Sequence, residues 1–203
     1  MECQMKIPGT ILMLGIVIIA GMPGFAKPEA SMGNQDQELI EAVGRNDTAM
    51  ITQLLDQGAS VQAQDGKGRT PLLLVVDRNH VESANLLIEA GADVNAQDHQ
   101  LDSPLLLGGA RGYLEILTLI LEVNPDSTIY NRYGGTALIP ACERGHVETV
   151  RKLLQTGVDI NHVNRLGWTA LLEAIILRDG GPRHQESVRL LINAGADVNL
   201  PDG

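Results

Sequence analysis

Pairs of adjacent aliphatic residues recur along the chain at intervals of 33 positions. A second aliphatic position keeps the same interval, and each time it follows a hydroxyl residue and then proline or alanine. Polar turn residues separate these apolar segments. A fixed period of this length predicts a repeat architecture. The pairs are Leu54-Leu55, Leu87-Ile88, Ile120-Leu121 and Leu153-Leu154, and the second position is Leu72, Leu105, Leu138 and Leu171.

Residues that start and stop helices keep the same register. Thr70 precedes Pro71, so its hydroxyl is expected to cap a helix whose first position tolerates proline. Gly91, Gly157 and Gly195 closely follow aliphatic segments of their units, where we expect a left-handed backbone that ends a helix. Asp-x-Asn segments come next, and we expect their side chains to bond their own backbone in a turn. These segments are Asp93–Asn95, Asp159–Asn161 and Asp197–Asn199.

Three segments carry a family resemblance: Gly68–Leu72, Gly145–Glu148 and Gly91–Asn95 resemble the consensus of the ankyrin repeat. The resemblance covers residues 36–202 and implies an all-α solenoid of helix-turn-helix units joined by β-hairpin-like loops. The glycine interval of the last unit is 38 positions, which predicts an insertion near residues 177–183. The expected units are 36–64, 65–97, 98–130, 131–163 and 164–201.

The chain departs from that consensus at one position. The histidine of the family's Thr-Pro-Leu-His segment is absent, and an aliphatic residue holds its place in every unit that has the segment. We therefore expect an apolar seam between neighbouring units in place of a polar network. The aliphatic residues are Leu73, Leu106, Ile139 and Leu172.

The N-terminal residues 7–26 carry no charge, follow Lys6 and end in small residues. This pattern predicts a signal peptide over 1–26, cleaved before Lys27, and a linker over 27–35. The alternative is an uncleaved membrane anchor, since about 20 uncharged residues can span a bilayer. Cleavage would leave Cys142 as the one cysteine, in a slot that otherwise holds small or aliphatic residues, so we expect a buried, inert thiol.

Ankyrin units behind an export signal resemble a set of bacterial periplasmic proteins. The resemblance implies a periplasmic or secreted location. It also implies an alternative role as a chaperone-like or accessory factor that supports an exported enzyme such as a catalase.

Acidic residues outnumber basic ones by 25 to 15, which leaves a net charge of −10. Phosphate backbones and anionic membrane surfaces attract basic footprints, so this balance argues against nucleic-acid and membrane partners. A protein partner of basic or mixed charge fits the balance better. The chain itself predicts neither the identity of that partner nor an oligomeric state.

Catalytic chemistry is not predicted by any motif. The five histidines lack the spacing of metal ligands, and His80, His146 and His184 share one repeat register that marks helix starts. The segment Gly108–Gly112 lacks the lysine of a phosphate-binding loop and falls where other units place a helix, which its glycines should weaken. We therefore expect no enzyme activity, no cofactor and no metal.

Protein binding is predicted at the hairpin tips and on the first helices, because these positions vary without disturbing the core of a solenoid. Arginine, tyrosine and tryptophan dominate many binding interfaces, and the last two tips combine them. In the alternative reading, Trp168 packs on the neighbouring tip and the arginines form solvated ion pairs. The predicted partner-binding residues are Arg132, Tyr133, Arg165, Leu166, Trp168, Lys67, Arg69, Arg111 and Arg144, and Asp77, Arg78 and Glu143 extend the patch.

The register of the repeat continues to the last residues. Asp202 aligns with Asp65, Asp98, Asn131 and Asn164, which predicts the start of a sixth unit. The last helix pair is rich in aliphatic residues, so we expect its outer face to be an incompletely covered edge.

Overall fold

The computed structural model divides into two units, Met1–Ser31 and Met32–Gly203. The structure describes residues 33–176 and 180–200, all of which belong to the second unit. The predicted signal peptide, part of the linker, residues 177–179 of the insertion and Asp202 lie outside these residues. No helix in the described ranges is both long and apolar enough to cross a membrane.

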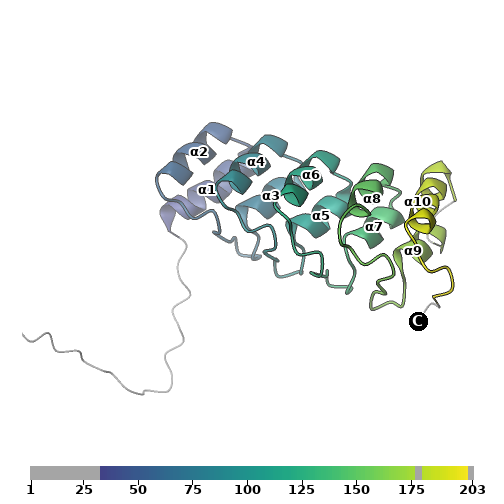
Figure 1. Cartoon of the computed structure of the whole chain (residues 1–203). Coiled ribbons are helices and arrows are strands. Elements are labelled where there is room, and N and C mark those ends of the chain that lie inside the picture. Colours follow the sequence, from purple (N-terminus) through teal and green to yellow (C-terminus); the bar gives the residue numbers. More distant parts are fainter. Residues whose placement is uncertain (1–32, 177–179, 201–203) are drawn as a thin grey trace, which may run out of the picture. The chain divides into compact units, whose positions relative to one another are not determined.

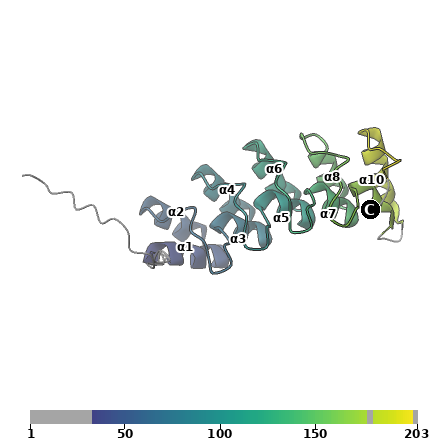
Figure 2. The same ribbon diagram turned by 90° about the horizontal axis from the view of Figure 1, so that it is seen from below.

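The described residues form helices joined by turns, with no β-strand among them. Consecutive helices pair, and each pair packs on the next. Figures 1 and 2 show the first helices of the pairs in one row and the second helices in another. This confirms the predicted all-α solenoid. The helices are α1 (Asn34–Arg45), α2 (Thr48–Asp56), α3 (Pro71–Asp77), α4 (Val81–Glu89), α5 (Pro104–Arg111), α6 (Leu114–Glu122), α7 (Leu138–Glu143), α8 (Val147–Leu153), α9 (Ala170–Ile176) and α10 (Pro182–Asn193).

Hydroxyl residues cap three of the first helices. The Thr70 hydroxyl accepts a hydrogen bond from the backbone N–H of Leu73 at 3.3 Å, as predicted, and Ser103 and Thr169 repeat the arrangement. The fourth residue of this column, Thr136, behaves differently. Because α7 begins only at Leu138, the buried Thr136 hydroxyl has no hydrogen-bond partner.

The second helices end in two ways. Gly91 and Gly195 have φ angles of 84° and 96°, which confirms the left-handed backbone expected there. The same expectation is wrong for Gly157, whose φ lies outside the left-handed region. There the Thr156 hydroxyl donates to the Leu153 carbonyl oxygen at 2.6 Å, so a side chain satisfies the free end of α8.

The turns after the second helices follow the predicted pattern. In each Asp-x-Asn segment the aspartate accepts a hydrogen bond from the backbone N–H of the asparagine. The distances are 2.9 Å for Asp93 to Asn95, 3.0 Å for Asp159 to Asn161 and 2.9 Å for Asp197 to Asn199.

The seam between neighbouring first helices is apolar, as the sequence predicts. Leu73, Leu106 and Ile139 are buried, and Leu172 is half-buried. Burying an aliphatic side chain of this size stabilises a fold by about 1.5–3 kcal/mol. Cys142 lies in the same core at 0% exposure, and burial raises the pKa of its thiol. The predicted burial of this cysteine is therefore confirmed, and its lack of reactivity stays a prediction.

Two adjacent glycines lie inside α5, where the repeat register places a helix. A Cβ atom on Gly109 would lie 2.9 Å from the Ala137 Cβ and 3.0 Å from the Ala137 carbonyl oxygen. Gly108 is different, because a Cβ there would have ordinary contacts at 3.8 Å or more. Gly109 thus permits the close approach of the next unit, whereas Gly108 makes no such close contact.

Candidate protein-binding groove

One side chain organises each hairpin tip. The aspartate or asparagine at the start of the unit accepts two backbone N–H hydrogen bonds from the loop that follows it. Fixing the loop in this way holds the tip residues between the two bonds in a set position. The arrangement repeats four times, with Asp65 bonded to Lys67 and Arg69, Asp98 to Gln100 and Asp102, Asn131 to Tyr133 and Gly135, and Asn164 to Leu166 and Trp168.

Neighbouring tips are also joined to each other. The backbone N–H of His99 donates to the Lys67 carbonyl oxygen at 3.0 Å, and that of Arg165 donates to the Tyr133 carbonyl oxygen at 2.8 Å. The second and third tips are joined by the Arg132 guanidinium, which donates to the Gln100 amide oxygen at 2.7 Å. The four tips therefore form a connected row.

Two adjoining cavities lie between the tips and the first helices, and we call them together the inner groove. The larger, about 590 Å³, spans units 98–130 and 131–163, and the smaller, about 220 Å³, spans units 65–97 and 98–130. Asp102, Leu107 and Arg111 line both cavities, which makes the groove continuous. The larger is also lined by Leu106, Ala110, Asn131, Arg132, Tyr133, Pro140, Glu143, Arg144 and His146, and the smaller by Lys67, Arg69, Leu73, Asp77, Asp98 and Gln100.

The structure brings six of the nine predicted partner-binding residues into this groove and leaves three outside. Those inside are Lys67, Arg69, Arg111, Arg132, Tyr133 and Arg144. Of the remaining three, Arg165 lines a separate surface cavity beside Tyr130 and Val163. Leu166 is 57% exposed, and Trp168 is half-buried.

Arg132 is held by its neighbours, in line with the alternative reading in which the tip arginines form ion pairs. Its guanidinium donates to the Gln100 amide oxygen at 2.7 Å, lies 3.8 Å from the Asp102 carboxylate and sits 5.1 Å from the centre of the Tyr133 ring. Arg165 in turn donates to the Arg132 carbonyl oxygen at 3.2 Å. Both pairs join residues about 30 positions apart, in adjacent units.

Two further cations of the groove have carboxylate partners, and one is held by a backbone carbonyl. Arg69 contacts Asp65 at 2.6 Å, and Arg111 contacts Asp77 of the preceding unit at 2.7 Å. Arg144 donates to the Ala110 carbonyl oxygen, also in the preceding unit. The groove lining thus holds five lysine and arginine residues against four carboxylates, on a chain whose net charge is −10.

The carboxylates of the tips respond differently to this setting. Burial raises the pKa of Asp102, and the neighbouring Asp98 raises it further, against the opposing effect of Arg132. Burial also acts to raise the pKa of Asp65, but hydrogen bonds from the Arg69 side chain and from the loop backbone outweigh it and lower the pKa.

The histidines take structural positions. His80 and His146 directly precede α4 and α8, as predicted, whereas His184 is the third residue of α10 because that helix starts at Pro182. Burial lowers the pKa of His146, which lines the groove. Among the described residues, no cluster of histidine, cysteine and carboxylate side chains could hold a metal ion.

One ring contact escaped the sequence reasoning. Tyr130 stacks on His162 with ring centres 4.4 Å apart, and the His162 ring also hydrogen-bonds the Gly134 carbonyl oxygen at 2.6 Å. Both residues lie near the end of their units. The signal that could have revealed the contact is the one-residue offset from the 33-position register, which places the two rings on adjacent units.

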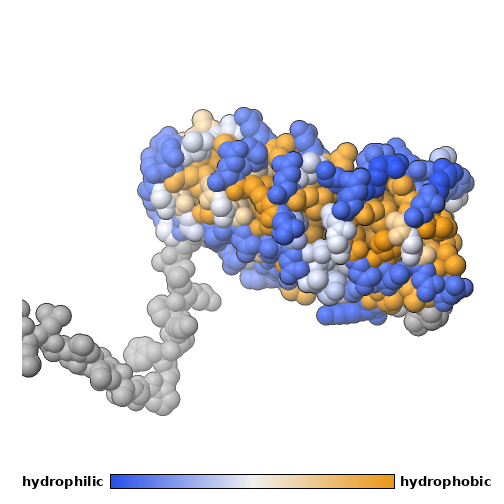
Figure 3. Space-filling view, in the orientation of Figure 1, coloured by the Kyte–Doolittle hydropathy of each residue, from blue (hydrophilic) through white to orange (hydrophobic). Residues whose placement is uncertain are grey.

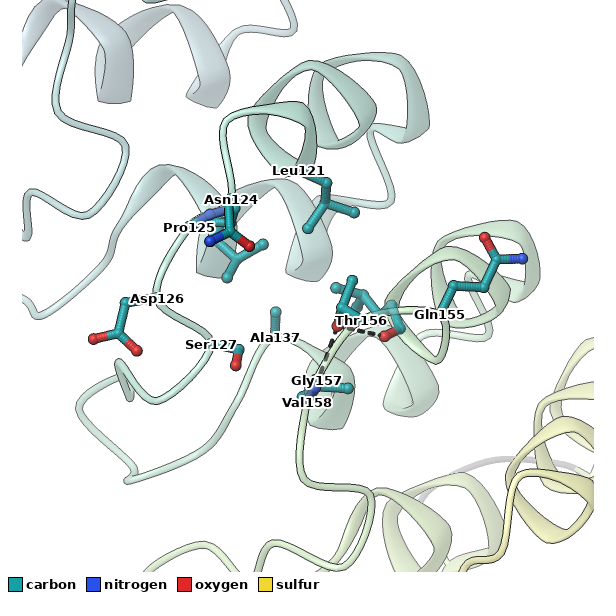
Figure 4. A pocket seen from close by; sticks show the side chains of 12 residues that line it. Leu121, Asn124, Pro125, Asp126, Ser127, Ala137, Gln155, Thr156, Gly157 and Val158 are labelled. Atoms are coloured by element: carbon teal, nitrogen blue, oxygen red, sulfur yellow. Dashed lines mark hydrogen bonds between the residues drawn. The ribbon is translucent and has the colours of Figure 1, made fainter.

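A second large cavity, about 570 Å³, lies between the same two units and contains none of the predicted residues. Figure 4 shows Leu121, Asn124 and Pro125 on one side of it, Thr156 and Val158 on the other, and Ala137 between them. Its floor also includes the buried Leu105 and Leu153. Apolar residues reach the surface in bands between helix pairs in Figure 3, and they cover a broader area over the C-terminal helices.

Comparison with known proteins identifies the family that has this architecture. A family model described as ankyrin repeats (3 copies) matches residues 24–98 and 105–202. A crystal structure of an ankyrin repeat domain from Acinetobacter baumannii is 53% identical, with a TM-score of 0.79, over 81% of this chain and 84% of that chain. The crystal structure of another ankyrin repeat protein is 44% identical, with a TM-score of 0.79, over 82% of this chain and 85% of that one.

Proposed function

The chain belongs to the ankyrin-repeat family, and from that premise we propose that it is a non-catalytic module that binds a protein partner in the inner groove. The family is a general protein-interaction fold and is typically non-enzymatic. The observation that carries the proposal is the gathering of Lys67, Arg69, Arg111, Arg132, Tyr133 and Arg144 around one continuous groove.

The groove has the composition of a binding surface. Leu106, Leu107 and Pro140 provide an apolar floor, and Arg132 with Tyr133 provides one wall. Tyr133 is 51% exposed although Arg132 lies over its ring, so the ring keeps a large area for a partner. Tyrosine and arginine beside a water-excluding apolar surface are the residues that carry most binding energy in protein interfaces.

We propose further that the protein works after export, in the periplasm or as a secreted protein. The uncharged residues 7–26 and the small residues before Lys27 support this location. The mass of the protein recovered from a periplasmic fraction tests it. An N-terminus at Lys27 is expected, and recovery of the full-length chain from the membrane fraction would favour the anchored alternative.

Affinity capture from a periplasmic extract tests the binding function. The double variant Arg132→Ala/Tyr133→Ala is compared with the wild type and with Arg189→Ala, which removes an exposed arginine of α10 far from the groove lining. We expect the groove variant to lose the proteins that the wild type and the control retain, with an unchanged circular dichroism spectrum. Equal capture by all three proteins would sink the proposal.

The accessory role makes a different prediction from simple binding. If the captured protein is an exported enzyme, such as a catalase, then deletion of the gene should lower the activity of that enzyme without lowering the amount exported. Unchanged activity would leave a binding module with no chaperone-like role.

A further inference from the structure

One hairpin tip carries a leucine at a position where the other three tips have glycine. The four residues of this column are 33 positions apart, and all have a left-handed backbone with φ angles between 61° and 81°. That conformation is routine for glycine, whereas the Cβ atom of another residue crowds the backbone. Leu101, which is 41% exposed, therefore holds a strained conformation. The column is Gly68, Leu101, Gly134 and Gly167.

Two glycines of this column leave room for a side chain of the next tip. A Cβ atom on Gly68 would lie 2.6 Å from the His99 ring, and one on Gly134 would lie 2.9 Å from the Arg165 side chain. Both distances are too short for a real Cβ contact. His99 and Arg165 hold equivalent positions in their units. The space beside the glycine is therefore filled twice by the side chain that the repeat register places there.

Arg132 holds the equivalent position at the tip that follows Leu101. Because Leu101 has a side chain of its own, the space that a glycine leaves open is not available to Arg132. The backbone contact differs too. His99 and Arg165 each donate a backbone hydrogen bond to the preceding tip. Among the described residues, no such bond joins the Arg132 N–H to the Gln100 carbonyl oxygen. Arg132 thus lacks both the glycine contact and the backbone bond of its two counterparts.

The three equivalent side chains also differ in the cavities that they line. Arg165 lines the separate surface cavity of about 620 Å³, and Leu101 lines that same cavity. His99 lines neither cavity of the inner groove, whereas Arg132 lines the larger of the two. The side chain that follows the leucine is therefore the one of the three that lies in the groove.

We propose that Leu101 is a positioning residue of the inner groove, because its side chain takes the space beside its own tip and turns Arg132 into the groove. There the Arg132 guanidinium bonds Gln100 and lies over the exposed Tyr133 ring. The proposal rests on the function proposed above, in which Arg132 and Tyr133 meet the partner. It also gives a reason for the strained backbone of Leu101, since such strain tends to persist where it serves a site.

An electrostatic account of Arg132 would leave Leu101 without a role. In that account, attraction to Asp102 and Gln100 alone draws the guanidinium into the groove. The Arg132 and Asp102 side chains are 47% and 32% exposed and their charged atoms lie 3.8 Å apart, and ion pairs of this kind contribute little. The electrostatic account predicts that Arg132 stays in place when the Leu101 side chain is removed.

The experiment compares two variants that both relieve the strain. Leu101→Gly removes the Cβ atom and opens the space beside the tip. Leu101→Asn keeps a Cβ atom, and asparagine tolerates the left-handed backbone better than leucine does. Both variants should melt at or above the temperature of the wild type. In the isotope-labelled protein, nuclear Overhauser effects between Arg132 and the Tyr133 ring report the position of Arg132, and Arg132→Ala assigns them.

A second measurement follows the Asp102 carboxyl carbon through a pH titration. Arg132 lowers the pKa of Asp102, so withdrawal of the guanidinium should raise that pKa further. We expect Leu101→Gly to lose the contact between Arg132 and Tyr133 and to raise the pKa of Asp102. Leu101→Asn should match the wild type in both.

A contact retained in Leu101→Gly, or lost equally in Leu101→Asn, would overturn the proposal. A role of Leu101 in stability alone would move the melting temperature and neither of these signals. Neither measurement needs a partner. The groove function is judged separately, by partner capture with Arg132→Ala/Tyr133→Ala, so a failure of one proposal is distinct from a failure of the other.

Discussion

The unit 65–97 and the pair of units 98–163 share the 33-residue register. Only the unit 65–97 has the expected helix cap, the expected aliphatic helix interface and the expected left-handed glycine. In the unit 65–97, Thr70 caps α3, Val75 and Val76 fill the helix interface, and a left-handed Gly91 ends the unit. In the pair, α5 has glycines at the two valine positions, Thr136 caps nothing, and Gly157 is not left-handed.

Two cavities, of about 570 Å³ and about 590 Å³, span units 98–130 and 131–163 at this irregular junction, and the second is lined by Arg132 and Tyr133. Local departures from a consistent pattern tend to occur where a surface serves binding more than stability. The comparison therefore separates residues that hold the stack together from residues that shape its groove.

The largest contrast should come from two leucines in one register. Leu74 is 3% exposed, whereas Leu107, 33 positions later, is half-buried and lines the groove. We expect Leu74→Ala to lower the free energy of unfolding by about 3 kcal/mol and Leu107→Ala by about 1 kcal/mol, since loss of a buried side chain leaves a cavity. Urea unfolding measures both, and partner capture should suffer only in Leu107→Ala. Equal destabilisation by the two variants would contradict the distinction between residues that hold the stack together and residues that line the groove.

The adjacent glycines of α5 should respond with opposite signs. Gly109→Ala brings a Cβ to 3.0 Å from the Ala137 carbonyl oxygen and should destabilise the fold by about 1–3 kcal/mol. Gly108→Ala has room and should stabilise it by up to about 1 kcal/mol, because alanine favours helix over glycine. Thermal melting of the two variants measures the effect. If both raise the melting temperature, the close approach of α5 and α7 is not a constraint.

The capping column offers a smaller contrast. Thr70→Val removes the cap of α3 and leaves the Leu73 N–H without its partner, so we expect a loss of about 1 kcal/mol. Thr136→Val removes a buried hydroxyl that has no partner and should be neutral or slightly stabilising. Chemical denaturation of both variants at neutral pH is the measurement, and an equal loss would mean that Thr136 makes an interaction the structure does not contain.

The smallest effects should appear in the pH dependence of two tip carboxylates. The lowered pKa of Asp65 gives stability that is present above its ordinary value of 3.8 and is lost as the pH falls. The raised pKa of Asp102 acts in the opposite sense, because the folded state holds its proton more tightly, so stability falls as the pH rises through that pKa.

Unfolding of Asp65→Asn and Asp102→Asn at pH 4 and pH 7 tests both signs, with differences below about 1 kcal/mol. Asp65→Asn should lose stability mainly at pH 7. Asp102→Asn should lose less at pH 7 than Asp65→Asn, since the substitution also removes the cost of an ionised carboxylate. A larger loss for Asp102→Asn at pH 7 than at pH 4 would contradict the raised pKa.

Much of the fold could be predicted because each unit repeats the same types of residue at the helix start, the turn and the helix interface. The capping role of Thr70, the turn role of Asp93 and the apolar seam at Leu73 depend on local sequence or on register alone, and all three are confirmed. The behaviour of Thr136 and Gly157 was not predictable in this way. Thr136 caps no helix because α7 begins only at Leu138. Gly157 follows α8, and the Thr156 hydroxyl satisfies the Leu153 carbonyl oxygen at the end of that helix.

The groove was predictable in part. The register correctly brought Lys67, Arg111 and Arg144 to one face, because equivalent positions on stacked units line up. The pairing of Arg132 with Asp102 and Gln100 was missed, since it joins adjacent tips through side-chain rotamers that a spacing rule does not contain. The sequence could not decide whether Trp168 binds a partner or packs on the neighbouring tip. In the structure Trp168 is half-buried and lies outside the groove.

The buried Cys142 can report how often the stack of helices opens. Its thiol is 0% exposed and lies on α7, which packs against both α5 and α9, so a thiol reagent reaches it only when the stack opens around α7. The rate of modification at Cys142, followed by peptide mapping to separate it from Cys3, therefore reports how often this junction opens in the native protein. A partner that bridges α5 and α7 should slow that rate. The rate of Cys142 modification would then measure how much of the protein has a bound partner.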